Sequence, residues 1–279
     1  MTDRYAVFGN PVAHSLSPAI HAAFARQTGQ DLAYEAILAP RDGFAAALRA
    51  FAAAGGSGAN VTLPFKEEAW RLADARSARA EAARAVNTLR FDAAGLFGDN
   101  TDGAGLIADL CRNLGFDLSG RSVLLLGAGG AARGALLPLL DQSPARLAIA
   151  NRNAQRAAVL AAEFSARLPA KGRVRLDACG LDALGAEAFD LVIDATSAGL
   201  AGAPPVLPGG LFSRDSLAYA MIYGQPAEAF LAFARAHGAA RCADGLGMLV
   251  EQAAESFHLW RGVRPETASV IERLRERSA

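Results

Sequence analysis

A short apolar run that ends in a glycine-rich turn constrains the fold of this chain most strongly. Arg121–Leu126 has the length and composition of a strand, and it is followed by the small residues Gly127-Ala128-Gly129-Gly130-Ala131. This pattern predicts a strand, a tight turn and a helix. Gly127 permits the sharp bend, Gly129 lets a pyrophosphate approach the backbone, and the helix N-terminus binds the anion. Tight packing without a ligand is the alternative interpretation.

A second apolar run, Ala145–Ala150, indicates which nucleotide such a turn binds. It ends at Asn151-Arg152, where an NAD-binding fold carries an Asp or Glu for the ribose hydroxyls. Asn151, Arg152 and Arg156, one helical turn further on, can instead hydrogen-bond or pair with a 2′-phosphate, which a carboxylate repels. The sequence therefore favours NADP over NAD.

The charge balance argues against a large polyanionic partner. The chain has 279 residues, and its 28 basic residues equal its 28 acidic residues. That balance disfavours nucleic acid and anionic membrane surfaces, and so favours a small-molecule ligand. Cys111, Cys179 and Cys242 have no spacing typical of a metal site or a redox pair. We expect no resident metal, no membrane-spanning segment and no signal peptide, hence a cytoplasmic protein.

Alternating strand and helix patterns at the N-terminus predict a parallel sheet. The expected elements there are strands Tyr5–Gly9, Leu32–Leu38 and Gly58–Thr62, with helices Ala19–Thr28 and Asp42–Ala54 between them. The expected elements that follow are helix Glu67–Ala83, strand Ala85–Arg90, helices Leu106–Leu114 and Ala154–Leu168, strands Phe189–Asp194, Leu217–Tyr223 and Gly238–Asp244, and helices Gly245–Gly262 and Pro265–Arg275. Pro138 should kink or end the helix after the glycine turn. The last helix is expected to pack back on the first domain.

Two serines follow the first expected strand. Ser17 stands directly before Pro18 and suits the N-cap of the next helix. Ser15 and Ser17 can alternatively present hydroxyls to a polyhydroxylated ligand, since each hydroxyl both donates and accepts. Without further information the pattern favours capping.

Lys66 falls in the first turn of the helix predicted after Pro64. A cation is misplaced at that end of a helix, because the helix dipole favours anions there. One interpretation is a solvated lysine paired with Glu67 or Glu68. The other is that the helix end and partial burial disfavour the charged ammonium, so that Lys66 serves as a general acid or base.

Asp102 lies in a polar, glycine-rich segment, Gly98–Gly105, just before a predicted helix. It suits the N-cap of that helix. It equally suits a carboxylate at a strand end, beside the crossing into the next domain. The two interpretations are compatible.

Seven short motifs follow one another over nearly the whole chain. They are Asn10-Pro11-x-x-His14-Ser15-x-Ser17-Pro18, Asn60-Val61-Thr62-x-Pro64-x-Lys66, Ala85-Val86-Asn87-Thr88, Asn100-Thr101-Asp102-Gly103, the glycine turn, Asn151-Arg152, and Asp244-Gly245-x-x-Met248-Leu249-Val250-x-Gln252-Ala253. In their residues and in their order, these motifs resemble the shikimate dehydrogenase family. The resemblance implies reversible reduction of 3-dehydroshikimate to shikimate with NADPH, on the route to chorismate and the aromatic amino acids. A quinate or aminoshikimate dehydrogenase is the nearest alternative, and a non-catalytic NADP-binding sensor is the alternative from another class.

The resemblance also implies roles for individual residues. Lys66 and Asp102 are similar to the family's catalytic pair. The residues implied to hold the substrate are Ser15, Ser17, Thr62, Asn87, Asp102, Tyr223 and Gln252. Those implied to hold the cofactor are Gly127, Ala128, Gly129, Gly130, Ala131, Asn151, Arg152, Arg156, Thr196, Met221 and Gly245. Without the resemblance, Met221 is more typical of a core residue.

The implied organisation is two α/β domains, in a monomer or a homodimer. Residues 1–102 with about 245–279 are expected to form a substrate-binding and catalytic domain with a mainly parallel sheet, and about 103–244 a Rossmann-type NADP domain. The chain departs from the family at four positions, to which no role is transferred. The usual residues there are Asp, Thr, Gly and an acidic residue, and this chain has Ala220, Glu228, Arg84 and Ala78.

Overall fold

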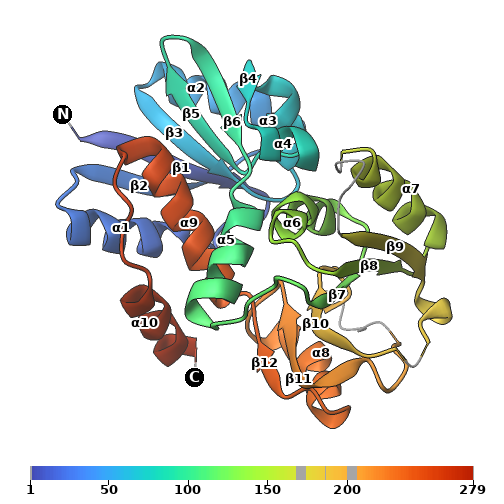
Figure 1. The fold of residues 1–279 in the computed structure, drawn as a ribbon. Coiled ribbons are helices and arrows are strands. Elements are labelled where there is room, and N and C mark those ends of the chain that lie inside the picture. The colour runs from blue at the N-terminus through green and yellow to red at the C-terminus, as the bar shows by residue number, and fades with distance from the viewer. Residues whose placement is uncertain (1, 168–173, 186, 200–205, 279) are drawn as a thin grey trace. The chain divides into compact units, whose positions relative to one another are not determined.

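The chain folds into two compact units, which the computed structural model describes over residues 2–167, 174–185, 187–199 and 206–278 (Figure 1). The first unit is Met1–Gly105 with Leu249–Ala279, and the second is Leu106–Met248. Each unit is built on its own six-stranded sheet with helices packed against it. Because most of the strands are parallel, the predicted α/β class is confirmed.

The sheet of the first unit combines a parallel half with a hairpin. Its strand order is β2-β1-β3-β5-β6-β4. β1 (Asp3–Gly9) lies between β2 (Leu32–Leu38) and β3 (Gly56–Val61), and these three strands are parallel. β5 (Thr88–Asp92) pairs antiparallel with β3 and with β6 (Gly95–Asp99). The predicted parallel start is confirmed, and a hairpin that was not predicted as two strands extends it.

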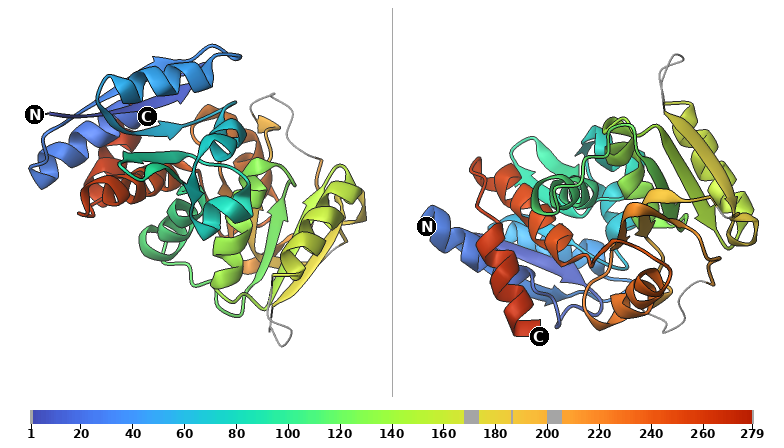
Figure 2. Two further views of the ribbon diagram at one scale, coloured as in Figure 1. Left: turned by 90° about the horizontal axis from the view of Figure 1, so that it is seen from above. Right: turned by 60° about the horizontal axis from the view of Figure 1, so that its bottom comes forward.

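Helices cover both faces of this sheet (Figure 2). α1 (Ser17–Thr28) and α2 (Phe44–Ala53) connect the parallel strands and lie on opposite faces. The other elements of the unit are α3 (Lys66–Leu72), β4 (Ala75–Arg76), α4 (Ala78–Ala83), the start of α5 (Asp102–Ala108), most of α9 (Leu246–Arg261), and α10 (Ala268–Ser278). Burial of apolar rings and branched side chains stabilises the unit, in a core that includes Phe8, Phe44, Phe51, Phe65 and Leu89.

The single helix expected over Glu67–Ala83 is wrong, since β4 separates α3 from α4. The Asp74 N–H donates to the Leu96 carbonyl at 2.8 Å, and the Asp74 carboxylate accepts from the Leu96 N–H at 2.8 Å. This segment therefore pairs with the edge of β6 instead of continuing the helix. Ser77 then starts α4 by accepting the Ala80 N–H at 3.1 Å.

The expected N-cap at Ser17 is also wrong. α1 begins at Ser17 itself, Leu16 stands at the N-cap, and the Ser15 hydroxyl accepts the Ser17 N–H at 3.3 Å. α5 likewise begins at Asp102, four residues before the expected Leu106, and continues beyond Ala108 as a π-helical turn. The Asp102 N–H donates to the Asn100 side chain at 3.2 Å. Neighbouring side chains thus satisfy these amides, and the side chains of Ser17 and Asp102 take other partners.

The second unit is a doubly wound sheet of six parallel strands, in the order β12-β11-β10-β7-β8-β9. β7 (Ser122–Leu126) lies between β8 (Arg146–Asn151) and β10 (Phe189–Asp194). The strand order reverses at β7, and sheets of this kind bind nucleotides at that point. The remaining elements are β9 (Arg175–Gly180), β11 (Phe212–Ala220), β12 (Arg241–Ala243), α6 (Gly130–Asp141), α7 (Ala154–Ser165) and α8 (Gln225–Ala236).

Two details of the second unit differ from expectation. Pro138 was expected to kink or end the helix. It lies inside α6, which continues to Asp141, so an end at the proline is excluded and a kink stays a prediction. Its position in the last turn limits the damage to one backbone hydrogen bond close to the helix end. β11 ends at Ala220, so Met221 and Tyr223 lie in the turn after the strand rather than within it. The expected end of α7 at Leu168 falls outside the described residues.

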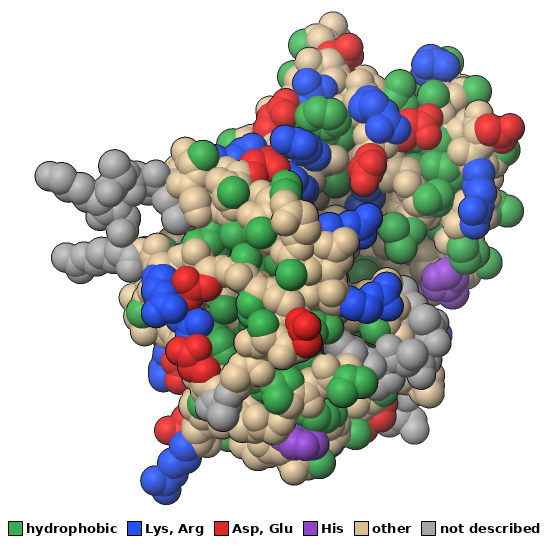
Figure 3. Space-filling view, turned by 90° about the vertical axis from the view of Figure 1, so that its right-hand side faces the viewer, with side chains coloured by type: hydrophobic (Ala, Val, Ile, Leu, Met, Phe, Trp, Pro, Cys, Tyr) green, Lys and Arg blue, Asp and Glu red, His purple; other side chains and the backbone are tan. Residues whose placement is uncertain are grey.

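Charged side chains of both signs are mixed on the surface. On the face in Figure 3, basic and acidic side chains are interspersed with hydrophobic ones. In the described part of the chain, every helix is too short or too polar to cross a membrane.

Candidate functional site

The glycine turn connects β7 to α6, as predicted, and leaves the helix N-terminus uncovered. Gly127 has a φ of +106°, and a Cβ there would lie 3.2 Å from the Ala195 carbonyl oxygen, so a larger residue would be strained. Among the described residues, no side chain caps α6, and an added Cβ at Gly129 or Gly130 would meet open space. The first amides of α6 therefore offer an anion site that a pyrophosphate can approach.

A hollow of about 280 Å³ adjoins this turn within the second unit, lined by Ala128, Arg133, Asn153, Gln155, Arg156, Val159 and Leu160. Arg133 is held by Glu163 through two hydrogen bonds of 2.8 and 2.6 Å. Arg152 and Arg156 are exposed, and within the described ranges neither pairs with a carboxylate. Two guanidinium groups therefore remain available to an anion at this end of β8.

Two asparagines order the loop that carries these arginines. Asn153 caps α7, since its side-chain oxygen accepts the Arg156 N–H at 3.2 Å. The Asn151 side chain donates to the Asn153 carbonyl at 2.9 Å. The loop that follows β8 is thus fixed by its own side chains, and the predicted phosphate-reading residues Asn151, Arg152 and Arg156 fall together there.

Three more predicted cofactor residues, Thr196, Met221 and Gly245, follow the ends of β10, β11 and β12 at the same edge of the sheet. The Thr196 N–H donates to the Asp194 carboxylate at 2.9 Å, and the Met221 N–H donates to the Asp194 carbonyl at 2.9 Å. A Cβ on Gly245 would lie 2.5 Å from the Met221 carbonyl oxygen. Glycine at position 245 therefore permits the close approach that fixes Met221. Tyr223 is half-buried in the same turn, and burial raises the pKa of its phenol.

In the first unit, Lys66 and Asp102 form an ion pair with 2.5 Å between Lys66 Nζ and Asp102 Oδ2. Lys66 begins α3 and Asp102 begins α5, and their side chains are 26% and 20% exposed. The alternative of a solvated lysine paired with Glu67 or Glu68 does not describe this arrangement. An amine and a carboxylate at this distance are suited to moving a proton at one substrate atom.

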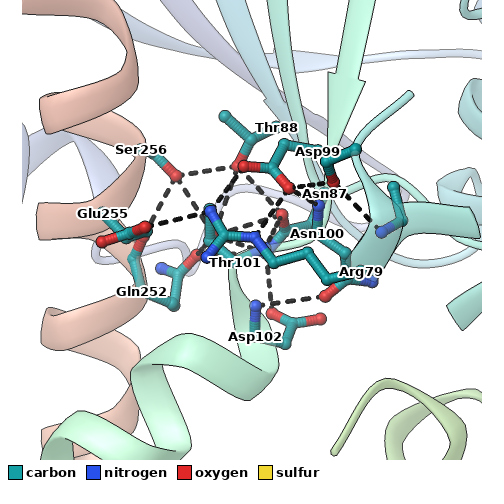
Figure 4. Close-up of polar contacts among 12 residues, drawn as sticks. Arg79, Asn87, Thr88, Asp99, Asn100, Thr101, Asp102, Gln252, Glu255 and Ser256 are labelled. Atoms are coloured by element: carbon teal, nitrogen blue, oxygen red, sulfur yellow. Dashed lines mark hydrogen bonds and ion pairs between the residues drawn. The ribbon is translucent and has the colours of Figure 1, made fainter. Parts of the chain in front are cut away.

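Asn87 joins this pair to a buried network of amides and hydroxyls (Figure 4). Its side-chain nitrogen donates to Asp102 Oδ1 at 2.8 Å and to the Thr101 hydroxyl at 3.0 Å, and it lies 3.3 Å from Gln252 Oε1. Its side-chain oxygen accepts the Thr101 N–H at 2.8 Å. The structure thus brings together Lys66, Asp102, Asn87 and Gln252, four of the residues singled out from the sequence.

Sequence reasoning missed the residues behind this network. Ser256 is fully buried and lies 2.8 Å from the Thr88 hydroxyl, and Asn60 Nδ2 donates to Ser256 Oγ at 3.0 Å. Tyr34 in turn donates to Asn60 Oδ1 at 2.7 Å. One signal was available, because Ser256 follows Gln252 by four residues and so shares its helix face.

Ser15, Ser17 and Thr62 are not bonded to the Lys66–Asp102 pair. Ser17 is buried in α1, and its hydrogen bond with Tyr34 opposes the rise that burial causes in the pKa of that phenol. Ser15 and Thr62 are half-buried, and Thr62 follows β3 directly. These hydroxyls belong to the loops at the ends of β1 and β3, in the same unit as Lys66.

Asp99 at the end of β6 is the buried charge nearest in sequence to this site. Burial alone raises its pKa, but the hydrogen bonds and charge of Arg79, with help from Ser77, hold the pKa below its ordinary value. Arg79 reaches the two carboxylate oxygens at 2.7 and 2.5 Å. The ionised form of Asp99 is therefore the one that the fold stabilises.

We expect Asp99 to make the folded protein sensitive to acid. A carboxyl whose pKa is lower in the folded state stabilises the fold above its unfolded pKa of about 4, and this stability is lost as the pH falls through the folded value. Asp99→Asn should be less stable than the wild type at neutral pH, and should lose less stability on acidification. Urea unfolding at a series of pH values measures this, with the exposed Asp215→Asn as control. Parallel pH profiles for wild type and Asp99→Asn would contradict it.

Three family models match the chain in succession. The shikimate dehydrogenase substrate binding domain matches residues 7–89, the shikimate/quinate 5-dehydrogenase model matches residues 109–201, and the shikimate 5′-dehydrogenase C-terminal domain matches residues 245–275. The matches follow the order of the sequence motifs.

Individual relatives are similar over the full length. A shikimate dehydrogenase (NADP(+)) of Dechloromonas aromatica is 60% identical over 99% of this chain and 98% of its own. A crystal structure of an enzyme from Pseudomonas putida is 48% identical with a TM-score of 0.90, covering 98% of both chains. The Thermus thermophilus shikimate 5-dehydrogenase in complex with NADP(H) and shikimate is 33% identical with a TM-score of 0.82, covering 100% of both chains.

Proposed function

This chain belongs to the shikimate dehydrogenase family, and we propose that it catalyses the reversible NADPH-dependent reduction of 3-dehydroshikimate to shikimate. The proposal rests on the 2.5 Å ion pair of Lys66 and Asp102, which Asn87 connects to a network of side-chain amides and hydroxyls. A non-catalytic NADP sensor has no need of this pair. The reaction serves the route to chorismate and the aromatic amino acids, in the cytoplasm, with the enzyme a monomer or a homodimer.

The first unit binds the substrate in this proposal, through residues 1–102 with about 245–279. The substrate carries hydroxyls and a carboxylate, and side-chain amides and hydroxyls suit both because they donate and accept. Asn87 and Gln252 already face Asp102 through the network described above. In this unit, the substrate-binding residues that we propose are Ser15, Ser17, Thr62, Asn87, Asp102 and Gln252. Tyr223, which belongs to the second unit, is proposed as a further substrate-binding residue.

The second unit binds NADP in this proposal, through residues of about 103–244 and Gly245. The uncovered N-terminus of α6 and the open space at Gly129 and Gly130 suit a pyrophosphate. Arg152 and Arg156 suit the 2′-phosphate, since both are exposed. Thr196 and Met221 stand at the strand ends where the rest of a dinucleotide extends. The bound cofactor supplies or accepts the hydride.

Lys66 is the proposed general acid of the reduction and the general base of the reverse reaction. Its ammonium group donates a proton to the carbonyl oxygen of the substrate as that oxygen becomes a hydroxyl, and in the reverse reaction the resulting amine takes the proton back. Asp102 orients the amine and hydrogen-bonds the same hydroxyl, while Asn87 fixes the second oxygen of Asp102 at 2.8 Å. Such positioning can remove about 7–11 kcal/mol of a reaction barrier.

The purified protein tests this proposal directly. With NADP present, shikimate should give NADPH absorbance at a rate at least about tenfold above quinate at equal concentration, a discrimination of about 1.4 kcal/mol. Comparable rates with both would identify a quinate/shikimate dehydrogenase. NADP binding without turnover of either compound, or of an aminoshikimate, would identify the sensor.

A further inference from the structure

Arg79 contacts carboxylates on two other elements of the first unit, Asp99 and Glu255 (Figure 4). It stands on α4, and its guanidinium donates to the Asp99 oxygens at 2.7 and 2.5 Å. Its Nη2 also donates to Glu255 Oε1, on α9, at 3.0 Å. One side chain therefore joins α4, the end of β6 and α9.

The Asp99 arm leads to the backbone that carries Asn87 and Asp102. The Asp99 carbonyl accepts the Asn87 N–H at 3.0 Å, and the Asp99 carboxylate accepts the Asn100 N–H at 2.7 Å. The Asn100 side chain in turn accepts the Asp102 N–H at 3.2 Å and donates to the Ala85 carbonyl at 3.1 Å. Fixing Asp99 therefore fixes the start of α5, where Asp102 presents its carboxylate.

The Glu255 arm leads to the helix face that carries Gln252. Residues three and four apart lie on one face of a helix, so Gln252, Glu255 and Ser256 share it. Gln252 and Ser256 both take part in the network around Asn87. The contact between Arg79 and Glu255 therefore fixes the rotation of α9 about its axis, and its position along that axis, where Gln252 contacts Asn87.

We infer that Arg79 is a positioning residue for the proposed reaction: its contact with Asp99 sets the place of Asp102, and its contact with Glu255 sets the place of Gln252. The inference rests on the proposed function. Its guanidinium lies between two carboxylates, and Arg264 also pairs with Glu255, so the charges of the cluster balance. The planar fork suits this position, because one guanidinium contacts both Asp99 oxygens and Glu255 at once.

The two arms predict different kinetic effects. Arg79→Met should lower kcat with shikimate by about tenfold to a hundredfold, because small displacements of catalytic groups carry costs of this size. Arg79→Lys should recover part of the loss. Glu255→Ala should raise the KM for shikimate about three- to tenfold with kcat within about twofold, as expected for lost ground-state binding. KM for NADP should stay unchanged in all three.

The control is Arg90→Gln, which removes an exposed ion pair with Asp92 in the β5–β6 hairpin and should leave all constants unchanged. Circular dichroism and thermal unfolding give the folded fraction of each variant. If Arg79→Met does not fold, Arg79→Lys and Glu255→Ala carry the test. Wild-type kcat and KM per folded molecule in the Arg79 and Glu255 variants would overturn the inference and make the cluster purely structural.

The activity of the wild-type protein distinguishes a failure of the proposed function from a failure of the inference about Arg79. If the wild type does not oxidise shikimate, the proposed function fails, and the inference fails with it. If the wild type is active and the variants lose only thermal stability, the inference alone fails. Calorimetric titration of shikimate into wild type and Glu255→Ala adds a binding readout without turnover, and equal affinities there would overturn the α9 arm.

Discussion

Lys66→Ala is expected to lower kcat by about two to four powers of ten, the usual contribution of a general acid or base, with the KM for shikimate little changed. The reason is the geometry of the pair, since Lys66 Nζ lies 2.5 Å from Asp102 and has no second amine nearby to replace it among the described residues. Steady-state oxidation of shikimate with NADP measures both constants. A rise in KM alone would mean that Lys66 only binds substrate.

Lys66→Arg separates proton transfer from charge. The chain has only two lysines, Lys66 and Lys171, while its other basic residues are arginines, so an amine is an uncommon choice here. A guanidinium keeps its proton, although it preserves the positive charge beside Asp102. The arginine variant should therefore be about as slow as the alanine variant. Near-wild-type turnover would contradict the acid–base role, and Arg71→Ala, exposed in the last turn of α3, is the control.

The parts of the fold that local sequence could predict are those with local causes. The turn at Gly127 needs a positive φ and a close approach to Ala195, and only glycine meets both needs, so the pattern is visible in the sequence. The buried strands around it are continuous apolar runs, as expected where helices cover both faces of a parallel sheet. The strand, turn and helix were accordingly predicted in their observed places.

Non-local pairing explains the failures. Residues 67–83 have helix-forming composition throughout, yet Asp74 pairs with Leu96 across the edge of the sheet and breaks the helix there. No local sequence pattern identifies Leu96 as the partner, because it lies on β6, the second strand of the hairpin, 22 residues further along the chain. Ser17 illustrates the same limit at smaller scale, since the helix begins earlier than expected, at Ser17 itself, with Leu16 at the N-cap and the Ser15 hydroxyl accepting the Ser17 N–H.

For the candidate site too, the identities of the residues could be predicted from the sequence, whereas the distances between them could not. Residue chemistry pointed to Lys66 and Asp102, and the family resemblance added Asn87 and Gln252. The mutual distances of these residues depend on β3, β5, β6 and α9 together. Asn60, Ser256 and Arg79 were given no role, because buried polar residues that act through others carry no local signature. They become visible only when each buried donor and acceptor is matched to its partner.

Replacement of Arg152 and Arg156 by alanine together is expected to raise the KM for NADP by about ten- to a hundredfold and to leave the KM for NAD within about threefold. A tenfold to hundredfold loss corresponds to about 1.4–2.7 kcal/mol for the two side chains together. This is below the roughly 1.5–3 kcal/mol that each hydrogen bond to a charged group can contribute, because both side chains are exposed and solvent screens their charges. The 2′-phosphate is the only group that distinguishes the two cofactors. The loss should therefore appear in the NADP constant alone.

Arg133→Ala is the matched comparison for this double variant. Arg133 lines the same hollow, but Glu163 holds it through two hydrogen bonds, so its charge is already compensated. Its removal should weaken NADP and NAD by similar factors, if it weakens either. The ratio of kcat/KM for NADP to kcat/KM for NAD thus distinguishes loss of the phosphate contact from general damage to the loop. An unchanged ratio in the Arg152 and Arg156 double variant would mean that other groups select the cofactor.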